Sequence, residues 1–217
     1  MTVMRKWLLT LLVTSAAVSA SYLWIDRPVA SWVRVQFPRH EVFVALTYIP
    51  DPLLVVAVVI FLLLGLKSFM GRPLSSWQML ILLCSVSVTM TEATKNELKF
   101  VFGRYWPDTW IHNNPSFLHD GAYGFNFFHG GAAYGSFPSG HTAIACAVAS
   151  VLWIGYPKLR VLWTLAVLAV VVGLVGADYH FIGDTIAGAF VGSTVGWMTM
   201  TLAAGARHPS ADRGETS

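Results

Sequence analysis

The segment at residues 138–141, with the sequence Pro-Ser-Gly-His, has the composition of an anion-binding helix start. Ser139 is a suitable N-cap, and Gly140 lets the backbone approach a bound anion closely. The first N–H groups of a helix have no partner within it, and the helix dipole adds positive potential, so phosphate can bind there. His141 adds a group that gains and loses a proton near neutral pH. The segment indicates chemistry on a phosphate group; the alternative is an ordinary helix start that contains a histidine.

A second reactive pair is His180 and Asp184, which share a face if their segment is helical because they are four residues apart. A carboxylate there can accept the imidazole Nδ1–H and leave Nε2 free as a nucleophile. Taken alone, the pair is also compatible with a structural hydrogen bond. Zinc is disfavoured, because a third closely spaced ligand is missing and the nearby lysine and arginine would repel a cation. We therefore expect no metal and no other cofactor.

Cationic residues stand at the end of an apolar segment, where Glu92, Lys95 and Lys99 recur at helical spacing. Charges at membrane depth usually face the interior of a helix bundle or a functional cavity. A lysine can instead extend its side chain to the lipid headgroups, and we favour this for Lys95. The glycine and proline that follow predict a helix end beside Lys99 and Arg104. We expect these two cations to face the same water layer.

Composition places these residues in a membrane protein. The chain has 217 residues, of which 55% are hydrophobic and 12% charged, whereas ordinary soluble domains have about 25% charged residues. A formal charge of +3 without a basic run argues against a nucleic-acid partner. Six apolar segments approach the roughly 20 residues that span a bilayer, near residues 7–25, 53–66, 77–98, 142–156, 161–179 and 185–203. We predict an all-α, polytopic membrane helical bundle of about six transmembrane helices, with one domain at 1–206 and a polar tail at 207–217.

The placement of lysine and arginine predicts the orientation of this bundle. With a cytoplasmic N-terminus, eight of these residues lie on the cytoplasmic side and six on the other. Lys99, Arg104, His141 and His180 then all fall on the extracytoplasmic face. We expect a bacterial inner (plasma) membrane protein with its active site on that side. The first apolar segment is also compatible with a cleaved secretory signal, which would leave this topology unchanged.

Two further segments leave alternatives open. The loop at 105–135 is long and too aromatic for disorder. Our hypothesis is that it covers the phosphate site and meets the substrate headgroup or the membrane interface; the alternative is a packed lid without substrate contact. In the last apolar segment, Gly188, Gly192 and Gly196 form a stripe of small residues. We favour helix packing within the bundle for this stripe, with a homodimer face as the alternative.

The chain resembles the type-2 phosphatidic acid phosphatase family, a six-helix membrane bundle related to the vanadium haloperoxidases, at Lys99 with Gly103-Arg104 and Pro107, at Pro138-Ser139-Gly140-His141, and at His180 with Asp184. The resemblance covers about residues 50–200. It implies that His180 is the nucleophile, forming a phosphohistidine, and that Asp184 orients it. It also implies that His141 protonates the leaving oxygen and then activates water. Lys99, with the serine and glycine of the second motif, would bind phosphate without a metal.

The chain departs from the family pattern at two positions. Trp106 stands where the family has an arginine before the proline of the first motif, and Leu174 replaces the arginine of the third. Two phosphate-binding guanidinium groups are therefore missing, each worth about 1.5–3 kcal/mol. Arg104 is our candidate to replace one of them as a phosphate ligand.

These observations predict an integral membrane phosphatase that acts on a lipid phosphate or pyrophosphate. The first alternative is a phosphotransferase, in which the phosphohistidine passes its phosphate to another lipid headgroup. The second is a catalytically weak protein that binds or transports a lipid phosphate, suggested by the two absent arginines. The residues leave open which lipid is the substrate.

Overall fold

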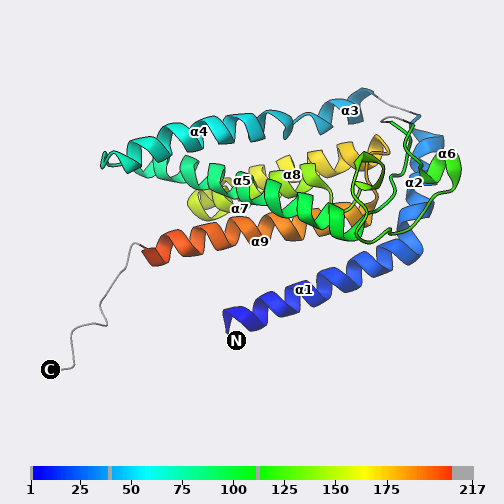
Figure 1. Cartoon of the computed structure of the whole chain (residues 1–217), viewed down its shortest axis with the longest axis horizontal. Coiled ribbons are helices and arrows are strands. Elements are labelled where there is room, and N and C mark those ends of the chain that lie inside the picture. Colours follow the sequence, from blue (N-terminus) through cyan, green and yellow to red (C-terminus); the bar gives the residue numbers. More distant parts are fainter. Residues whose placement is uncertain (1, 39–40, 111–112, 207–217) are drawn as a thin grey trace.

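The computed structural model describes residues 2–38, 41–110 and 113–206, and within them the chain consists of helices and loops (Figure 1). The polar tail predicted at 207–217 lies outside the described residues. The α-helices are α1 (Val3–Ala20), α2 (Asp26–Gln36), α3 (Glu41–Thr47), α4 (Asp51–Phe69), α5 (Ser76–Phe102), α6 (Phe117–Asp120), α7 (Gly140–Gly155), α8 (Arg160–Gly176) and α9 (Ile182–Ala206).

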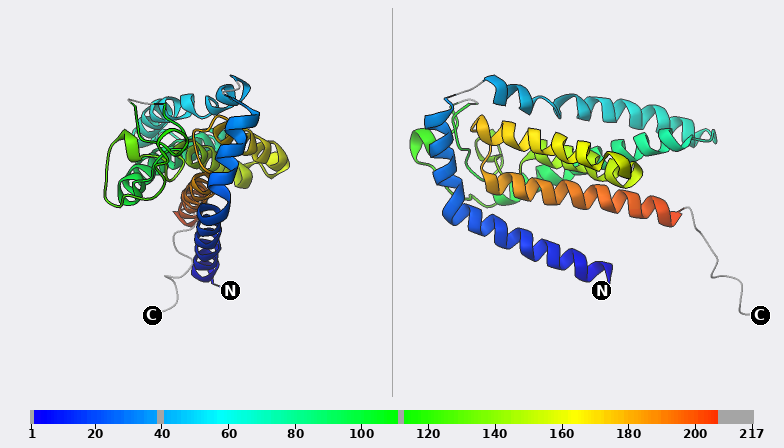
Figure 2. Two further views of the ribbon diagram at one scale, coloured as in Figure 1. Left: turned by 90° about the vertical axis from the view of Figure 1, so that its right-hand side faces the viewer. Right: turned by 180° about the vertical axis from the view of Figure 1, so that it is seen from behind.

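Each of the six predicted apolar segments is helical, so the prediction of an all-α membrane bundle is confirmed. By length and composition, the described helical stretches able to cross a membrane are Val3–Gln36, Glu41–Phe69, Pro157–Gly176 and Ile182–Gly205. α7 is a shorter apolar helix, and α5 is long but carries charges at its C-terminal end. α1 diverges from the other helices and bends through a π-helical turn into α2, as Figure 2 shows.

The two helices that carry the first motifs have clear local start and stop signals. α5 begins with a capping box, in which the side chains of Ser75 and Gln78 each bond to the other's backbone N–H. It ends at Gly103, whose φ of 51° lies in the left-handed region that favours glycine. α7 begins after Ser139, whose hydroxyl accepts the N–H of Thr142. These signals set where Lys99 and His141 stand along their helices.

The glycine stripe of α9 packs against α7. A Cβ on any of the three glycines would meet backbone atoms of α7, and at Gly192 it would overlap the carbonyl oxygen of Ala143. The two helices therefore approach until their backbones touch, which is the role favoured from the sequence. Within the chain, α7 therefore covers the face that carries the three glycines.

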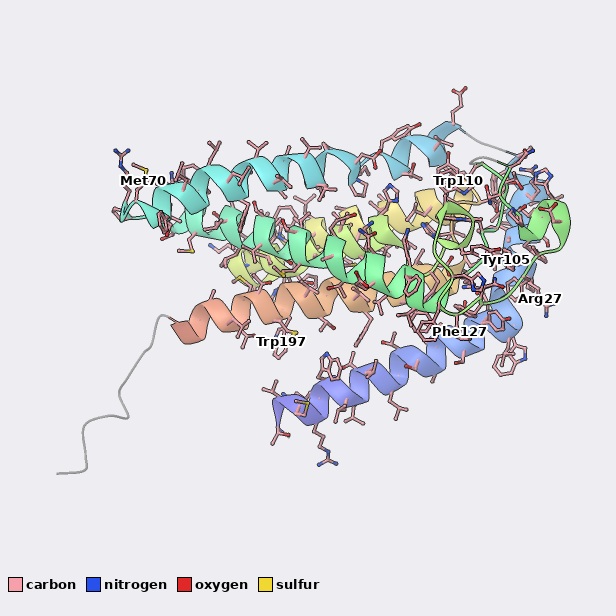
Figure 3. The ribbon with its side chains drawn as sticks, in the orientation of Figure 1. Arg27, Met70, Tyr105, Trp110, Phe127 and Trp197 are labelled. Carbon is pink, nitrogen blue, oxygen red and sulfur yellow. The ribbon has the colours of Figure 1, made fainter. Side chains whose placement is uncertain are left out.

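The aromatic loop between α5 and α7 folds back on the end of α5. The N–H of Asn126 donates to the carbonyl oxygen of Gly103 at 2.7 Å, and the indole N–H of Trp106 donates to the carbonyl oxygen of Ala132 at 2.7 Å. Figure 3 shows Tyr105, Trp110 and Phe127 gathered at this end of the bundle, opposite Met70 in the turn between α4 and α5. The loop is thus packed onto the bundle, beside the starts of α7 and α9.

Candidate active site

The predicted site residues lie where α5 ends and where α7 and α9 begin. The N–H of Ser139 donates to the carbonyl oxygen of Asp184 at 3.0 Å, which joins the second and third motifs directly. Trp106, just after α5, places its ring 5.1 Å from that of His180 and 5.5 Å from the ammonium of Lys99. All three motifs therefore meet at one end of the bundle.

The start of α7 leaves part of the predicted anion cradle available. Ser139 is buried, and its hydroxyl lies 3.0 Å from that of Thr142, so its side chain acts as a helix cap here. The N–H groups of Gly140 and His141 have no hydrogen-bond partner within the described part of the chain. These two backbone groups are available to an anion, and the Ser139 hydroxyl is engaged with Thr142.

Two lysines of α5 border this cradle. A Cβ on Gly140 would lie 2.9 Å from Cδ of Lys95, so the Lys95 side chain lies across the start of α7 instead of reaching for headgroups as we favoured. Its ammonium pairs with Glu92 at 2.9 Å. The ammonium of Lys99, by contrast, makes no ion pair or hydrogen bond with any described residue. Lys99 is therefore the cation whose charge is available to a bound phosphate.

His180 is a buried base that stays neutral at physiological pH. Its side chain is 3% exposed, and burial lowers its pKa to about 4. Its Nδ1 lies 3.5 Å from Oδ2 of Asp184, which is an electrostatic contact longer than a hydrogen bond. The same oxygen accepts the hydroxyl of Ser136 at 2.6 Å and the N–H of Phe181 at 3.0 Å. A small movement of the imidazole would complete the orienting bond.

Arg104 does not face this site, contrary to the prediction that it binds phosphate. The guanidinium is completely buried and donates to Asp184 at 2.5 Å and to Asp26 at 2.6 Å. It also lies 3.2 Å from the hydroxyl of Tyr123. A guanidinium with no exposed surface and two carboxylate partners cannot bind an external anion as well. Its position behind Asp184 makes it an anchor for the carboxylate that lies beside His180.

Asp26 is a part of this arrangement that we did not identify from the sequence. It lies at the junction of α1 and α2, and its Oδ1 accepts the hydroxyl of Ser21 at 2.6 Å and the N–H of Gly183 at 3.0 Å. One signal was present, since Asp26 is the only acidic residue among the first 40. A lone carboxylate in an apolar region usually has a buried partner.

Asp51, the first residue of α4, was also missed. Its Oδ1 lies 2.9 Å from Nε2 of His141, and both side chains are partly exposed, at 49% and 40%. The pair spans the gap between the start of α4 and the start of α7. It gives the predicted general acid a carboxylate partner of its own, separate from Asp184.

The two positions that depart from the family pattern are filled by buried side chains. Trp106 packs between His180 and Lys99, as its ring distances show. Leu174 is completely buried in α8, and its carbonyl oxygen accepts the N–H groups of Tyr179 and His180 at 2.9 and 3.2 Å. Neither position therefore offers a cation to phosphate, as the sequence indicated.

Comparisons with known proteins agree with this arrangement. A model of the PAP2 superfamily matches residues 79–207, a range that includes all three motifs. No curated protein matches the chain. Among solved structures, the crystal structure of the first transmembrane PAP2 type phosphatidylglycerolphosphate phosphatase from Bacillus subtilis is similar, with a TM-score of 0.54 and 18% identity over 95% of this chain and 96% of that one. At this identity, the likeness shows a shared fold.

Proposed function

The chain belongs to the PAP2 superfamily, and from its site we propose that it is an integral membrane phosphatase that hydrolyses a lipid phosphate or pyrophosphate through a phosphohistidine. The observation that carries this proposal is the neutral, buried His180 near the ammonium of Lys99, which has no ion-pair partner among the described residues. A neutral imidazole is a nucleophile, and an unpaired ammonium next to it attracts the phosphate that it would attack.

In the first step, phosphate binds to Lys99 and to the backbone N–H groups that begin at Gly140. Nε2 of His180 then forms a bond to phosphorus while the bond from phosphorus to the leaving oxygen breaks. The imidazolium of His141 gives its proton to that oxygen, and the lipid alcohol leaves. The carboxylate of Asp184 stabilises the positive charge that the phosphorylated imidazole acquires.

In the second step, the neutral His141 removes a proton from water as the water oxygen attacks phosphorus. The bond between phosphorus and His180 breaks, and inorganic phosphate leaves. His180 returns to its neutral form and His141 to its protonated form, so atoms and charges balance over the cycle. In this scheme no step calls for a metal ion.

We propose that the site faces the extracytoplasmic side of a bacterial inner membrane. The turn between α4 and α5, flanked by Lys67 and Arg72, lies at the opposite end of the bundle from Trp110, as Figure 3 shows for its neighbour Met70. Basic turns favour the cytoplasmic side, which supports this orientation.

The test is phosphate release by the purified protein in detergent, with a panel of lipid phosphates and with and without EDTA. We expect turnover that EDTA leaves unchanged, that His141→Ala strongly reduces and that His180→Ala abolishes. Acid-labile phosphate should attach to the wild-type protein but not to His180→Ala. Turnover that requires a metal, or that survives the loss of His180, would contradict the mechanism.

The same assay separates the alternatives. A phosphotransferase would release phosphate from the donor only when an acceptor lipid is added. A protein that binds or transports lipid phosphates would retain its function in His180→Ala.

A further inference from the structure

We propose that Asp51 makes the site selective for lipid phosphomonoesters over lipid diphosphates, by holding a carboxylate beside the leaving oxygen. This inference rests on the proposed phosphatase function and names the substrate class of that same site. Asp51 belongs to α4, outside residues 79–207 that the superfamily model matches.

The in-line geometry of phosphoryl transfer places the leaving group on the side of Asp51. In phosphoryl transfer, the attacking and leaving atoms lie roughly in line on opposite sides of phosphorus. With His180 as the attacking group, the leaving oxygen lies on the side of the group that protonates it, which is His141. The carboxylate of Asp51 lies 2.9 Å from Nε2 of that histidine. Any group attached to the leaving oxygen therefore comes close to a negative charge.

The two substrate classes differ at this position. In a phosphomonoester, the leaving oxygen is attached to an uncharged carbon. In a diphosphate, it is attached to a second phosphorus that carries at least one negative charge. Because Asp51 is only half buried, the lipid headgroup can reach it, and repulsion between the carboxylate and the second phosphate disfavours the diphosphate.

The three cations on and just after the C-terminal end of α5 do not offset that repulsion. Lys95 is already paired with Glu92 at 2.9 Å, and Arg104 is buried between two carboxylates. Lys99 is available, but the phosphate that reacts uses its charge. Lys95, Lys99 and Arg104 are therefore not free to neutralise a second phosphate beside Asp51.

Asp51 also positions the general acid. A carboxylate hydrogen-bonded to Nε2 of His141 holds the ring in place. Replacing aspartate by asparagine keeps an oxygen that can accept this hydrogen bond but removes the charge. Asp51→Asn therefore separates the positioning effect from the charge effect better than Asp51→Ala does.

The experiment compares an isoprenyl monophosphate and the diphosphate of the same chain length, so that the hydrocarbon part is identical. Initial rates of phosphate release in mixed micelles give kcat/KM for each lipid before the monophosphate product accumulates. In the wild-type protein we expect kcat/KM to favour the monophosphate by about tenfold or more, the effect of one uncompensated charge in a partly exposed site. In Asp51→Asn we expect this ratio to fall several-fold toward one.

Glu97→Gln is the matched control, because Glu97 is exposed on α5 and the substitution makes the same change in net charge. Its substrate ratio should equal that of the wild type. A second measurement compares the inhibition constants of inorganic phosphate and pyrophosphate for the wild type and both variants. It requires only that each variant retains some turnover. Pyrophosphate should inhibit Asp51→Asn more strongly than the wild type, relative to phosphate.

Equal kcat/KM values for the two lipids in the wild type would overturn the inference, as would a ratio that Asp51→Asn leaves unchanged. Either result would leave the phosphatase function standing. Failure of the function itself is recognised differently, as an absence of phosphate release from every lipid phosphate or as release that persists in His180→Ala.

Discussion

Replacing Arg104 by glutamine distinguishes an anchor of Asp184 from a ligand of phosphate. The structure gives Arg104 two buried carboxylate partners, Asp184 and Asp26, both with fully buried side chains. Removing one member of a buried ion pair costs about 3–5 kcal/mol, because the remaining charge is left without compensation. The two pairs share one guanidinium, so their costs do not add in full. We expect Arg104→Gln to lower the free energy of unfolding by about 3–5 kcal/mol and to reduce kcat, because Asp184 loses its anchor.

Lys99→Gln is the matched comparison, since its ammonium makes no bond to any described residue. Its loss should leave the free energy of unfolding nearly unchanged. The contact with phosphate is a charge-assisted bond worth about 1.5–3 kcal/mol, which corresponds to about a ten- to hundredfold reduction in kcat/KM. The two substitutions remove the same charge but should affect different quantities.

The measurements are denaturant unfolding in detergent and initial-rate kinetics on one lipid phosphate. An Arg104→Gln protein with wild-type stability and a raised KM would refute this reasoning, because that is the behaviour of an exposed phosphate ligand. A Lys99→Gln protein with unchanged kcat/KM would show that the unpaired ammonium has no role in binding phosphate.

Three further outcomes are expected. Burial holds the pKa of His180 at about 4, so its nucleophilic neutral form persists until the pH falls near that value; the acidic limb of the kcat/KM profile should lie near pH 4, and a limb near 6.5 would contradict this. Gly192→Val should lower the free energy of unfolding by about 1–3 kcal/mol, because the new side chain clashes with the Ala143 carbonyl. Gly205→Ala should not lower it, because a Cβ at Gly205 meets no atom within 4 Å. Trp106→Ala should lower the free energy of unfolding by about 3–5 kcal/mol, measured by denaturant unfolding, since a buried indole is removed.

The helices and their ends could be predicted from the sequence because their signals are local. Apolar segments of bilayer length became helices, and the end of α5 followed from a glycine that adopts a left-handed conformation. The proximity of the three motifs followed from topology. In a chain that crosses a membrane repeatedly, the end of one helix and the start of the next lie on the same side. His141 and His180 were therefore correctly expected at the same end.

The partners of these residues could not be predicted. The sequence suggests Arg104 as a replacement for one of the missing phosphate-binding arginines, yet its guanidinium turns inward to Asp26, which is 78 residues away in the chain. His141 meets Asp51 across 90 residues. A side chain's direction depends on the rotation and tilt of neighbouring helices, and these are set by packing over many contacts.

The sequence by itself determined the helical membrane architecture and the chemistry available, because hydrophobic length and residue type are properties of short segments. It predicted a nucleophile, an acid and a phosphate cradle without their surroundings. Only the tertiary structure decided which charged side chains form ion pairs with each other and which do not. In the part of the chain that the structure describes, Lys99 has no ion-pair partner, while Lys95 and Arg104 are neutralised by neighbouring carboxylates. The physical reason is that charges attract over a few ångströms, and such distances between separate helices are created only when the helices pack.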